Sequence, residues 1–132
     1  MKKFKGLMTS LSPHWATPKW LYDELNKEFN FDFDPCPLNS IHNRLTIHWG
    51  NCNFINPPYG KEIGKWIAKA YSEAQGGATC VLLIPSRTDT KWWHDYIMKA
   101  DEIRFIKGRL KFGESKNSAP FPSAIVIFKG GK

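Results

Sequence analysis

The run Asn56-Pro57-Pro58-Tyr59 could activate an amino group whose lone pair is delocalised into a ring and is therefore a poor nucleophile. The side-chain oxygen of Asn56 can accept one N–H of such a group. The carbonyl of Pro57 can accept the other, because two successive prolines hold the backbone extended. Acceptors placed in this way stabilise the positive charge that develops on the nitrogen as it attacks. The ring of Tyr59 offers a surface on which a base could stack.

Asp34-Pro35-Cys36 is a second short polar motif, and both motifs are predicted to follow strands. Residues 31–34 alternate like a short strand that Pro35 stops, and residues 52–55 form a strand that runs into Asn56. Ligands of α/β sheets bind at the carboxyl ends of the strands. The pattern therefore predicts that Asp34 and Asn56 meet at one rim of a sheet.

Apolar periodicity predicts the elements that hold this rim. We expect a helix over 18–29 with Thr17 as its N-cap, a helix from Ile63 that ends at Gly76-Gly77, and a helix over 90–99 capped by Asp89. Further strands are expected over 79–84 and 102–106, followed by two strands over 108–112 and 123–128. The fold class is therefore α/β, with one domain over residues 1–132 and a mostly parallel sheet that ends in an antiparallel C-terminal hairpin.

Composition restricts the class of protein and of partner. The net charge of +7 favours a polyanionic partner such as nucleic acid. The three cysteines form no CxxC pair and the histidines show no ligand spacing, so we expect neither a disulfide framework nor a metal site. No apolar run is long enough to span a bilayer, and the first residues lack the apolar stretch of a secretion signal. We expect a cytoplasmic protein with no membrane partner, and its oligomeric state stays open.

Six motifs, in this order along the chain, resemble those of the small phage DNA N6-adenine methyltransferases. They are Trp15-Ala16-Thr17-Pro18, Phe33-Asp34-Pro35-Cys36-Pro37, Asn56-Pro57-Pro58-Tyr59-Gly60, Pro85-Ser86-Arg87-Thr88-Asp89-Thr90, Gly108-Arg109-Leu110-Lys111-Phe112 and Ala119-Pro120-Phe121-Pro122-Ser123. The resemblance covers nearly the whole chain. It implies a minimal Rossmann-like sheet that binds S-adenosylmethionine (SAM), and methyl transfer to N6 of an adenine that is flipped out of DNA into the Asn-Pro-Pro-Tyr site. It also implies a phage or prophage protein in a bacterial host.

The resemblance further implies roles for the other motifs. Cofactor-binding residues would be Trp15, Thr17, Pro18, Asp34, Pro35 and Cys36, with the Asp34 carboxylate accepting from amino or hydroxyl groups of SAM. Trp15 and Trp49 could each form a wall for the adenine of SAM. Each role has a structural alternative: Thr17 as a helix cap, Asp34 as a turn residue, and the tryptophans as core residues.

Two features depart from the usual SAM site. The loop Cys36-Pro37-Leu38-Asn39-Ser40 contains no glycine, which normally lets the backbone approach the cofactor. The stretch between Asp34 and Asn56 is also too short for the β-α units that normally supply an acidic residue to the ribose.

A cluster of basic residues near the other strand ends is expected to contact DNA phosphates, where it would set affinity rather than sequence choice. It comprises Arg87, Lys91, Lys107, Arg109 and Lys111, each of which could instead belong to a solvated charged face. Three other functions stay open: an N4-cytosine methyltransferase, a protein glutamine-N5 methyltransferase, and a catalytically inactive DNA-binding relative.

Overall fold

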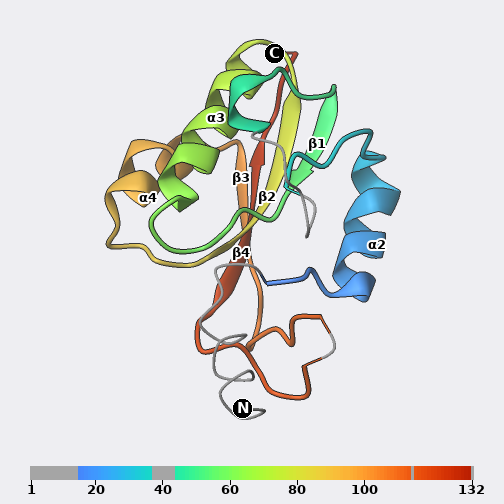
Figure 1. Cartoon of the computed structure of the whole chain (residues 1–132), viewed down its shortest axis with the longest axis vertical. Helices are drawn as coiled ribbons and strands as arrows, with labels where there is room; N and C mark the ends of the chain where they lie inside the picture. Colours follow the sequence, from blue (N-terminus) through green and yellow to red (C-terminus); the bar gives the residue numbers. More distant parts are fainter. Residues whose placement is uncertain (1–14, 37–43, 114, 132) are drawn as a thin grey trace.

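The computed structural model of the chain describes residues 15–36, 44–113 and 115–131. In this part of the chain a four-stranded sheet lies between helices on both faces, which confirms the α/β class (Figure 1). The loop that follows Cys36, where a glycine was missing, lies outside the described residues. The strands are β1 (Cys52–Ile55), β2 (Thr79–Pro85), β3 (Glu102–Phe105) and β4 (Ser123–Phe128), and the helices are α2 (Lys19–Phe29), α3 (Ile63–Gln75) and α4 (Lys91–Asp95), with 3₁₀ turns η1 (Arg44–Thr46) and η2 (Ile97–Lys99).

The sheet is mixed, so the prediction of a mostly parallel sheet is wrong. Its strand order is β1-β2-β4-β3, in which β1 and β2 are parallel while β4 runs antiparallel to both of its neighbours. A parallel return to the sheet needs a crossover connection, usually a helix. The described part of the segment between β3 and β4 contains no helix, so the chain re-enters between β2 and β3 in the opposite direction.

The predicted C-terminal hairpin is also wrong in one of its strands. Residues 108–112 form no strand, and β4 pairs instead with β3, where Ile103 lies opposite Val126. Gly108 has a φ of 75°, in the left-handed region that interrupts an extended strand. The apolar residues of this segment, Leu110 and Phe112, are buried by packing rather than by strand pairing.

The expected strand over 31–34 is reduced to a single bridge. Phe33 pairs in parallel with Asn53 of β1, and the backbone N–H of Phe54 donates to the Phe33 carbonyl at 3.1 Å. One bridge is enough to hold Asp34 beside the carboxyl end of β1.

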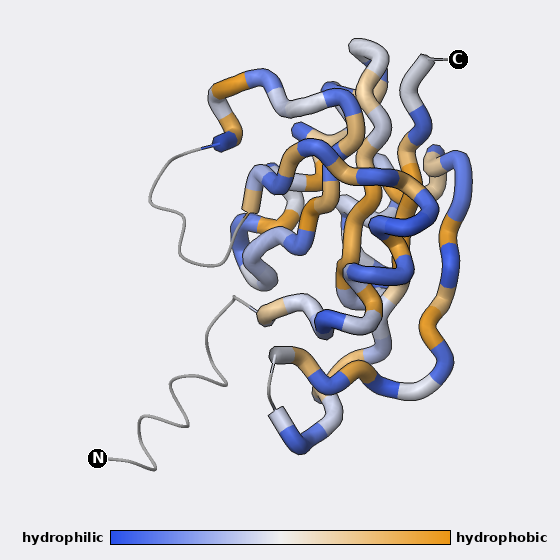
Figure 2. Tube along the Cα trace, turned by 90° about the vertical axis from the view of Figure 1, so that its right-hand side faces the viewer, coloured by the Kyte–Doolittle hydropathy of each residue, from blue (hydrophilic) through white to orange (hydrophobic). Residues whose placement is uncertain are grey.

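Two central strands form the middle of the core. Both β2 and β4 are buried along almost their full length, as the apolar run of β2 predicts for a strand covered on both faces. On one face the ring of Phe54 meets Tyr22 of α2 at 5.2 Å, and on the other the ring of Phe128 meets Tyr71 of α3 at 5.6 Å. Apolar residues are concentrated along the strands that form this core (Figure 2).

Helix ends agree with the sequence only in part. Helix α3 ends at Gln75 with Gly76 at its C-cap, as predicted. The hydroxyl of Thr90, rather than Asp89, caps α4 by accepting from the Trp93 N–H at 3.3 Å. Thr17 does not cap α2, whose N-cap position is Pro18 with no side-chain hydrogen bond. The hydroxyl of Thr17 is engaged elsewhere, in the site described below.

Glu73 of α3 ties the segment before β1 to the helix layer. Its carboxylate accepts hydrogen bonds from the Trp49 backbone N–H at 2.8 Å and from the Lys69 ammonium at 3.0 Å, and lies 3.3 Å from Nδ1 of His48. Burial by itself would raise the pKa of Glu73, but these interactions outweigh it and lower the pKa below its ordinary value.

The strand directions bring several loops to one edge of the sheet. Strands β1, β2 and β3 run the same way, because β4 is antiparallel to both β2 and β3. Their carboxyl ends therefore share an edge, which Asn56, Ser86 and Ile106 follow directly. We call this the carboxyl edge, and it is where the ligands of α/β sheets bind.

Candidate functional site

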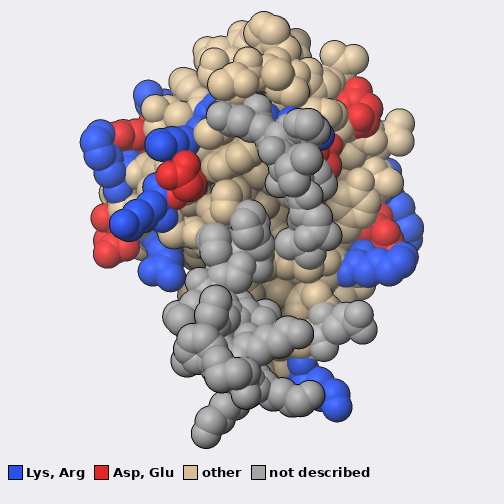
Figure 3. Space-filling view, in the orientation of Figure 1, with Lys and Arg blue, Asp and Glu red and all other residues tan. Residues whose placement is uncertain are grey.

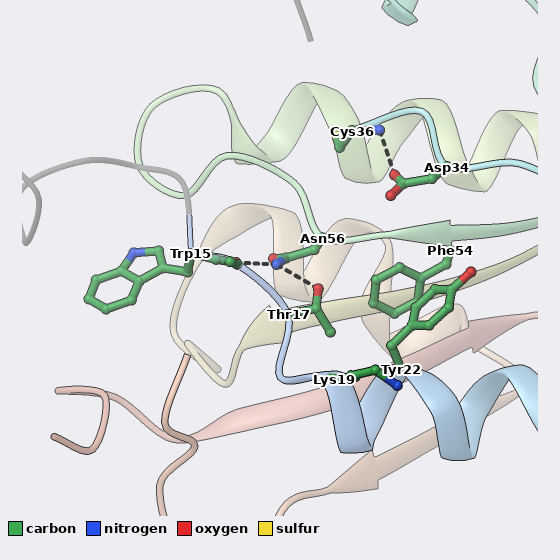
Figure 4. A pocket seen from close by; sticks show the side chains of 9 residues that line it. Trp15, Thr17, Lys19, Tyr22, Asp34, Cys36, Phe54 and Asn56 are labelled. Atoms are coloured by element: carbon green, nitrogen blue, oxygen red, sulfur yellow. Dashed lines mark hydrogen bonds between the residues drawn. The ribbon is translucent and has the colours of Figure 1, made fainter. Parts of the chain in front are cut away.

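A cavity of about 330 Å³ lies at the carboxyl edge, beside the end of β1. It is enclosed by the segment that leads into α2, by the turn after the Phe33 bridge, and by the end of β1 (Figure 4). Its lining residues are Trp15, Ala16, Thr17, Lys19, Tyr22, Asp34, Cys36, Phe54 and Asn56. Asp34 and Asn56 line the same cavity, as their positions at neighbouring strand ends predict. The volume is within the range of small-molecule sites, which starts at about 300 Å³.

Asn56 carries an acceptor that no described residue uses. Its Nδ2 donates to the backbone carbonyl of Trp15 and, at 3.0 Å, to the hydroxyl of Thr17. Its Oδ1 is buried and has no hydrogen-bond partner within the described part of the chain. An unpaired buried acceptor costs about 1–3 kcal/mol of stability. A buried acceptor that lacks a partner in a residue lining a cavity is therefore typical of a functional site.

The rest of the motif anchors the end of β1. Pro57 and Tyr59 are buried, and the Tyr59 hydroxyl donates to the carbonyl of Leu83 in β2 at 3.2 Å. Burial raises the pKa of Tyr59, so it stays protonated at neutral pH. Gly60 then takes a φ of 109°, which lets the chain turn from Pro58 and Tyr59 toward α3.

The ring of Tyr59 lies within an aromatic cluster that we define as Trp15, Tyr59, Phe112 and Phe121. Phe121 meets it edge-on at 5.4 Å and Phe112 at 6.4 Å, and only 8% of Tyr59 is exposed. Base stacking on Tyr59 stays a prediction, and in this structure neighbouring rings occupy most of its surroundings.

Trp15 contributes its backbone rather than its ring to the site. The indole packs edge-on against Phe112 at 5.5 Å and Phe121 at 5.4 Å, and it points away from Asn56 in Figure 4. The carbonyl of the same residue accepts the hydrogen bond from Asn56. Trp49 lies before the other end of β1, stacked with Trp66 at 6.2 Å, and is not among the lining residues.

Asp34 supplies a carboxylate to the opposite wall. One oxygen accepts from the Cys36 backbone N–H at 2.8 Å, which makes the tight turn around Pro35. Burial raises the pKa of Asp34, while this hydrogen bond and the charge of Arg44 act against the rise. The thiol of Cys36 is also raised in pKa by burial and is protonated at neutral pH. The rings of Tyr22 and Phe54 form the apolar part of the wall beside Asp34.

Sequence reasoning assigned no role to four lining residues, Ala16, Lys19, Tyr22 and Phe54, of which Ala16 lies within the motif Trp15-Ala16-Thr17-Pro18. Two signals could have found the other three. Lys19 and Tyr22 are three residues apart, so they share one face of α2 next to Thr17. Phe54 precedes Asn56 by two residues, so both side chains leave β1 on the same face.

The predicted basic residues lie on loops and, for Lys91, at the start of α4, and none of them lines the cavity. All five side chains belong to exposed residues; Arg87 follows β2, and Lys107, Arg109 and Lys111 follow β3. Lys91 forms an ion pair with Asp95 at 2.5 Å. On the face shown in Figure 3, basic side chains lie beside acidic ones at both flanks. Contact of these residues with phosphates stays a prediction.

Comparison with known proteins identifies the family. A family model described as "DNA N-6-adenine-methyltransferase (Dam)" matches residues 6–130. The chain belongs to this family. A DNA N-6-adenine-methyltransferase of Haemophilus phage HP1 (strain HP1c1) is 30% identical over 135 aligned residues, which cover 87% of this chain and 78% of the relative. No solved structure matches the chain. The resemblance that the six motifs indicate is thus confirmed.

Two further observations describe this DNA N-6-adenine-methyltransferase family member. In the ranges that the structure describes, no helix is both long and apolar enough to cross a membrane. Over the same ranges, no three His, Cys, Asp or Glu side chains come together in a group that could hold a metal ion.

Proposed function

We propose that this chain transfers a methyl group from SAM to N6 of adenine in DNA, and that the reaction takes place in the cavity at the carboxyl edge. The observation that carries the proposal is the unpaired Oδ1 of Asn56, because an amino group presented in the cavity would give this buried acceptor the donor that it lacks. Family membership supports the same chemistry.

The residues opposite Asn56 fit a cationic, hydrogen-bonding cofactor. When bound, SAM supplies a methyl group on a positively charged sulfonium. Asp34, which carries the opposite charge, would accept from its amino or hydroxyl groups, and the rings of Tyr22 and Phe54, which line the same cavity, would give its adenine an apolar surface. The Pro18 carbonyl accepts the first hydrogen bonds of α2 next to Thr17, and the Cys36 backbone N–H donates to Asp34 across Pro35.

The residues beside Asn56 act on the target base. A base in a duplex cannot reach the cavity, so it enters flipped out of the stack. Oδ1 of Asn56 would accept one N–H of the amine and the carbonyl of Pro57 the other, so that the nitrogen lone pair would be free to attack a methyl donor. The N–CH3 bond would form as the S–CH3 bond breaks, leaving the thioether of SAM, and the nitrogen would then lose a proton to solvent. No strong base is needed, because that proton becomes acidic only once the nitrogen carries the methyl group. Tyr59 holds this strand end in place through the Leu83 carbonyl.

The charge of the chain supports DNA as the substrate. The formal net charge is +7, and Arg87, Lys107 and Arg109 lie on exposed loops that follow the carboxyl ends of β2 and β3. Phosphate contacts from these loops would position the duplex over the carboxyl edge without selecting its sequence.

The test identifies the methylated product. The chain is incubated with methyl-labelled SAM and unmethylated DNA, and the DNA is digested to nucleosides and separated. We expect the label in N6-methyladenine. Label in N4-methylcytosine, label on protein only, or SAM binding without transfer would each overturn the proposal in favour of a cytosine enzyme, a glutamine enzyme or an inactive relative.

Two variants connect this product to the site. Asn56→Ala is expected to abolish transfer while calorimetric titration shows that SAM binding is largely kept. Asn51→Ala, which replaces an exposed asparagine before the other end of β1, is the matched control and is expected to transfer normally. Normal turnover by Asn56→Ala would refute the role of that residue.

A further inference from the structure

The side-chain amide of Asn56 is held by two oxygens of the segment that leads into α2. Its Nδ2 has two hydrogens, and the Trp15 carbonyl and the Thr17 hydroxyl each accept one of them. With both N–H groups engaged, the amide cannot rotate without losing two hydrogen bonds. Its Oδ1 is thereby fixed on the other side of the group, where it has no partner among the described residues.

The chemistry of the two holding atoms selects the amide nitrogen. A peptide carbonyl has lone pairs but no hydrogen, so the Trp15 carbonyl can pair with Nδ2 and not with Oδ1. A flipped amide would place two oxygens against each other. An aspartate at position 56 would meet the same repulsion, because an ionised carboxylate is an acceptor only.

The Trp15 carbonyl is itself fixed from two sides. The indole of Trp15 is packed into the aromatic cluster by Phe112 and Phe121. The neighbouring carbonyl of Ala16 accepts from the Gly113 N–H at 2.8 Å. A Cβ added to Gly113 would lie 3.4 Å from the Cβ of Ala16, so the two backbones approach closely. The segment between β3 and β4 therefore braces the segment that orients Asn56.

Thr17 is fixed by the start of the helix. The carbonyl of Pro18, the next residue, accepts from the backbone N–H groups of Leu21 and Tyr22 at 3.1 Å each. Thr17 itself gives the helix no cap, although a threonine before a proline at a helix start commonly does. Its hydroxyl faces Asn56 instead, at 3.0 Å.

We propose that Thr17 is a positioning residue, which together with the Trp15 carbonyl holds Asn56 in the orientation that presents Oδ1 to the target. This inference rests on the proposed function, since it assigns the orientation of the same acceptor. Two consequences follow. The site accepts a base that offers an exocyclic N–H and rejects one that offers a keto oxygen at that position. Position 56 also requires an amide, so a carboxylate does not replace it near neutral pH.

The test compares Thr17→Val, which removes the hydroxyl at nearly constant shape, with Thr17→Ser, which keeps it. Loss of one neutral hydrogen bond, about 1 kcal/mol, corresponds to a fall of about fivefold in kcat. We expect this fall in Thr17→Val with an unchanged KM for SAM, and near-normal kcat in Thr17→Ser. An unchanged kcat in Thr17→Val would overturn the proposal, and an unchanged kcat with a raised KM for SAM would show that the hydroxyl serves the cofactor instead.

Asn56→Asp supplies an independent test that does not depend on the folding of the Thr17 variants. We expect it to be nearly inactive at neutral pH and to regain activity as the pH falls, because a protonated carboxyl can donate to the Trp15 carbonyl. Wild-type activity in Asn56→Asp, with a flat pH profile, would contradict the inference.

A readout without turnover separates this inference from the proposed function. The side-chain amide hydrogens of Asn56, assigned by their loss in Asn56→Ala, should exchange with solvent more slowly in the wild type and Thr17→Ser than in Thr17→Val. An inactive wild type with this pattern would refute the proposed function alone. Equal exchange in all three proteins would refute the positioning role.

Discussion

Asn53 lies within β1 and Asn56 directly follows that strand, and we expect their replacement by alanine to affect stability very differently. Asn53 is fully buried and its amide is satisfied. Its Oδ1 accepts from the Gly50 N–H at 2.9 Å, and its Nδ2 donates to the carbonyls of Gly50 at 3.0 Å and Thr79 at 3.3 Å. Losing these three hydrogen bonds of about 1 kcal/mol each, with their part-buried partners left unpaired, predicts a loss of about 3–4 kcal/mol for Asn53→Ala.

Asn56→Ala loses only two hydrogen bonds, a cost of about 2 kcal/mol. The same change removes the unpaired Oδ1, whose burial costs about 1–3 kcal/mol in the folded protein. The two terms nearly cancel, so the free energy of unfolding should change by less than about 1 kcal/mol. The structure thus predicts that Asn53 serves stability and Asn56 serves chemistry.

Urea unfolding followed by circular dichroism measures both variants against the wild type. A common slope of free energy against urea concentration would show that the midpoints report stability alone. If Asn56→Ala were as destabilised as Asn53→Ala, Oδ1 would have a partner in the folded protein. The assignment of that oxygen as the free acceptor would then be refuted.

Three other predictions follow from the site and the charges. Burial raises the pKa of Asp34, so SAM affinity measured by calorimetry should decline as the pH falls, and at a higher pH than for an exposed aspartate, whereas Asp34→Asn should bind weakly without that decline. The pKa of Glu73 is lowered in the folded state, so its contribution is present above about pH 4.3 and is lost as the pH falls through the folded-state pKa. Glu73→Gln should therefore lose about 1–2 kcal/mol at neutral pH by urea unfolding, and the difference should shrink in acid; a constant difference would contradict the assignment. Arg87→Ala and Lys107→Ala should each weaken DNA binding and reduce the slope of log affinity against log salt by about one, whereas Lys27→Ala on α2 should leave both unchanged.

The regular elements could be predicted from local signals. The apolar face from Ile63 to Ala74 gives α3, and the continuous apolar run from Thr79 gives β2. These signals are strong because each element buries a whole face or both faces in the core. The shared rim of Asp34 and Asn56 was predictable for a related reason, since it depends only on strand direction.

The errors arise where long-range contacts override local pattern. Residues 108–112 resemble a strand, but Leu110 and Phe112 are buried without strand pairing, and Phe112 packs against Trp15, which is distant in the sequence. Thr17 has the type and position of a helix cap, yet its hydroxyl pairs with Asn56, which is 39 residues away. No window of sequence contains such contacts. The orientation of the Asn56 amide, on which the site depends, was therefore visible only in three dimensions.

A crystal structure of the chain with adenine-containing DNA and a SAM analogue that cannot donate its methyl group would test the central claim most directly. We expect N6 of a flipped adenine within hydrogen-bond distance of Oδ1 of Asn56, about 2.7–3.2 Å, with Nδ2 still held by Trp15 and Thr17. An adenine bound away from Asn56, or an Asn56 amide turned so that Nδ2 faces the base, would contradict it.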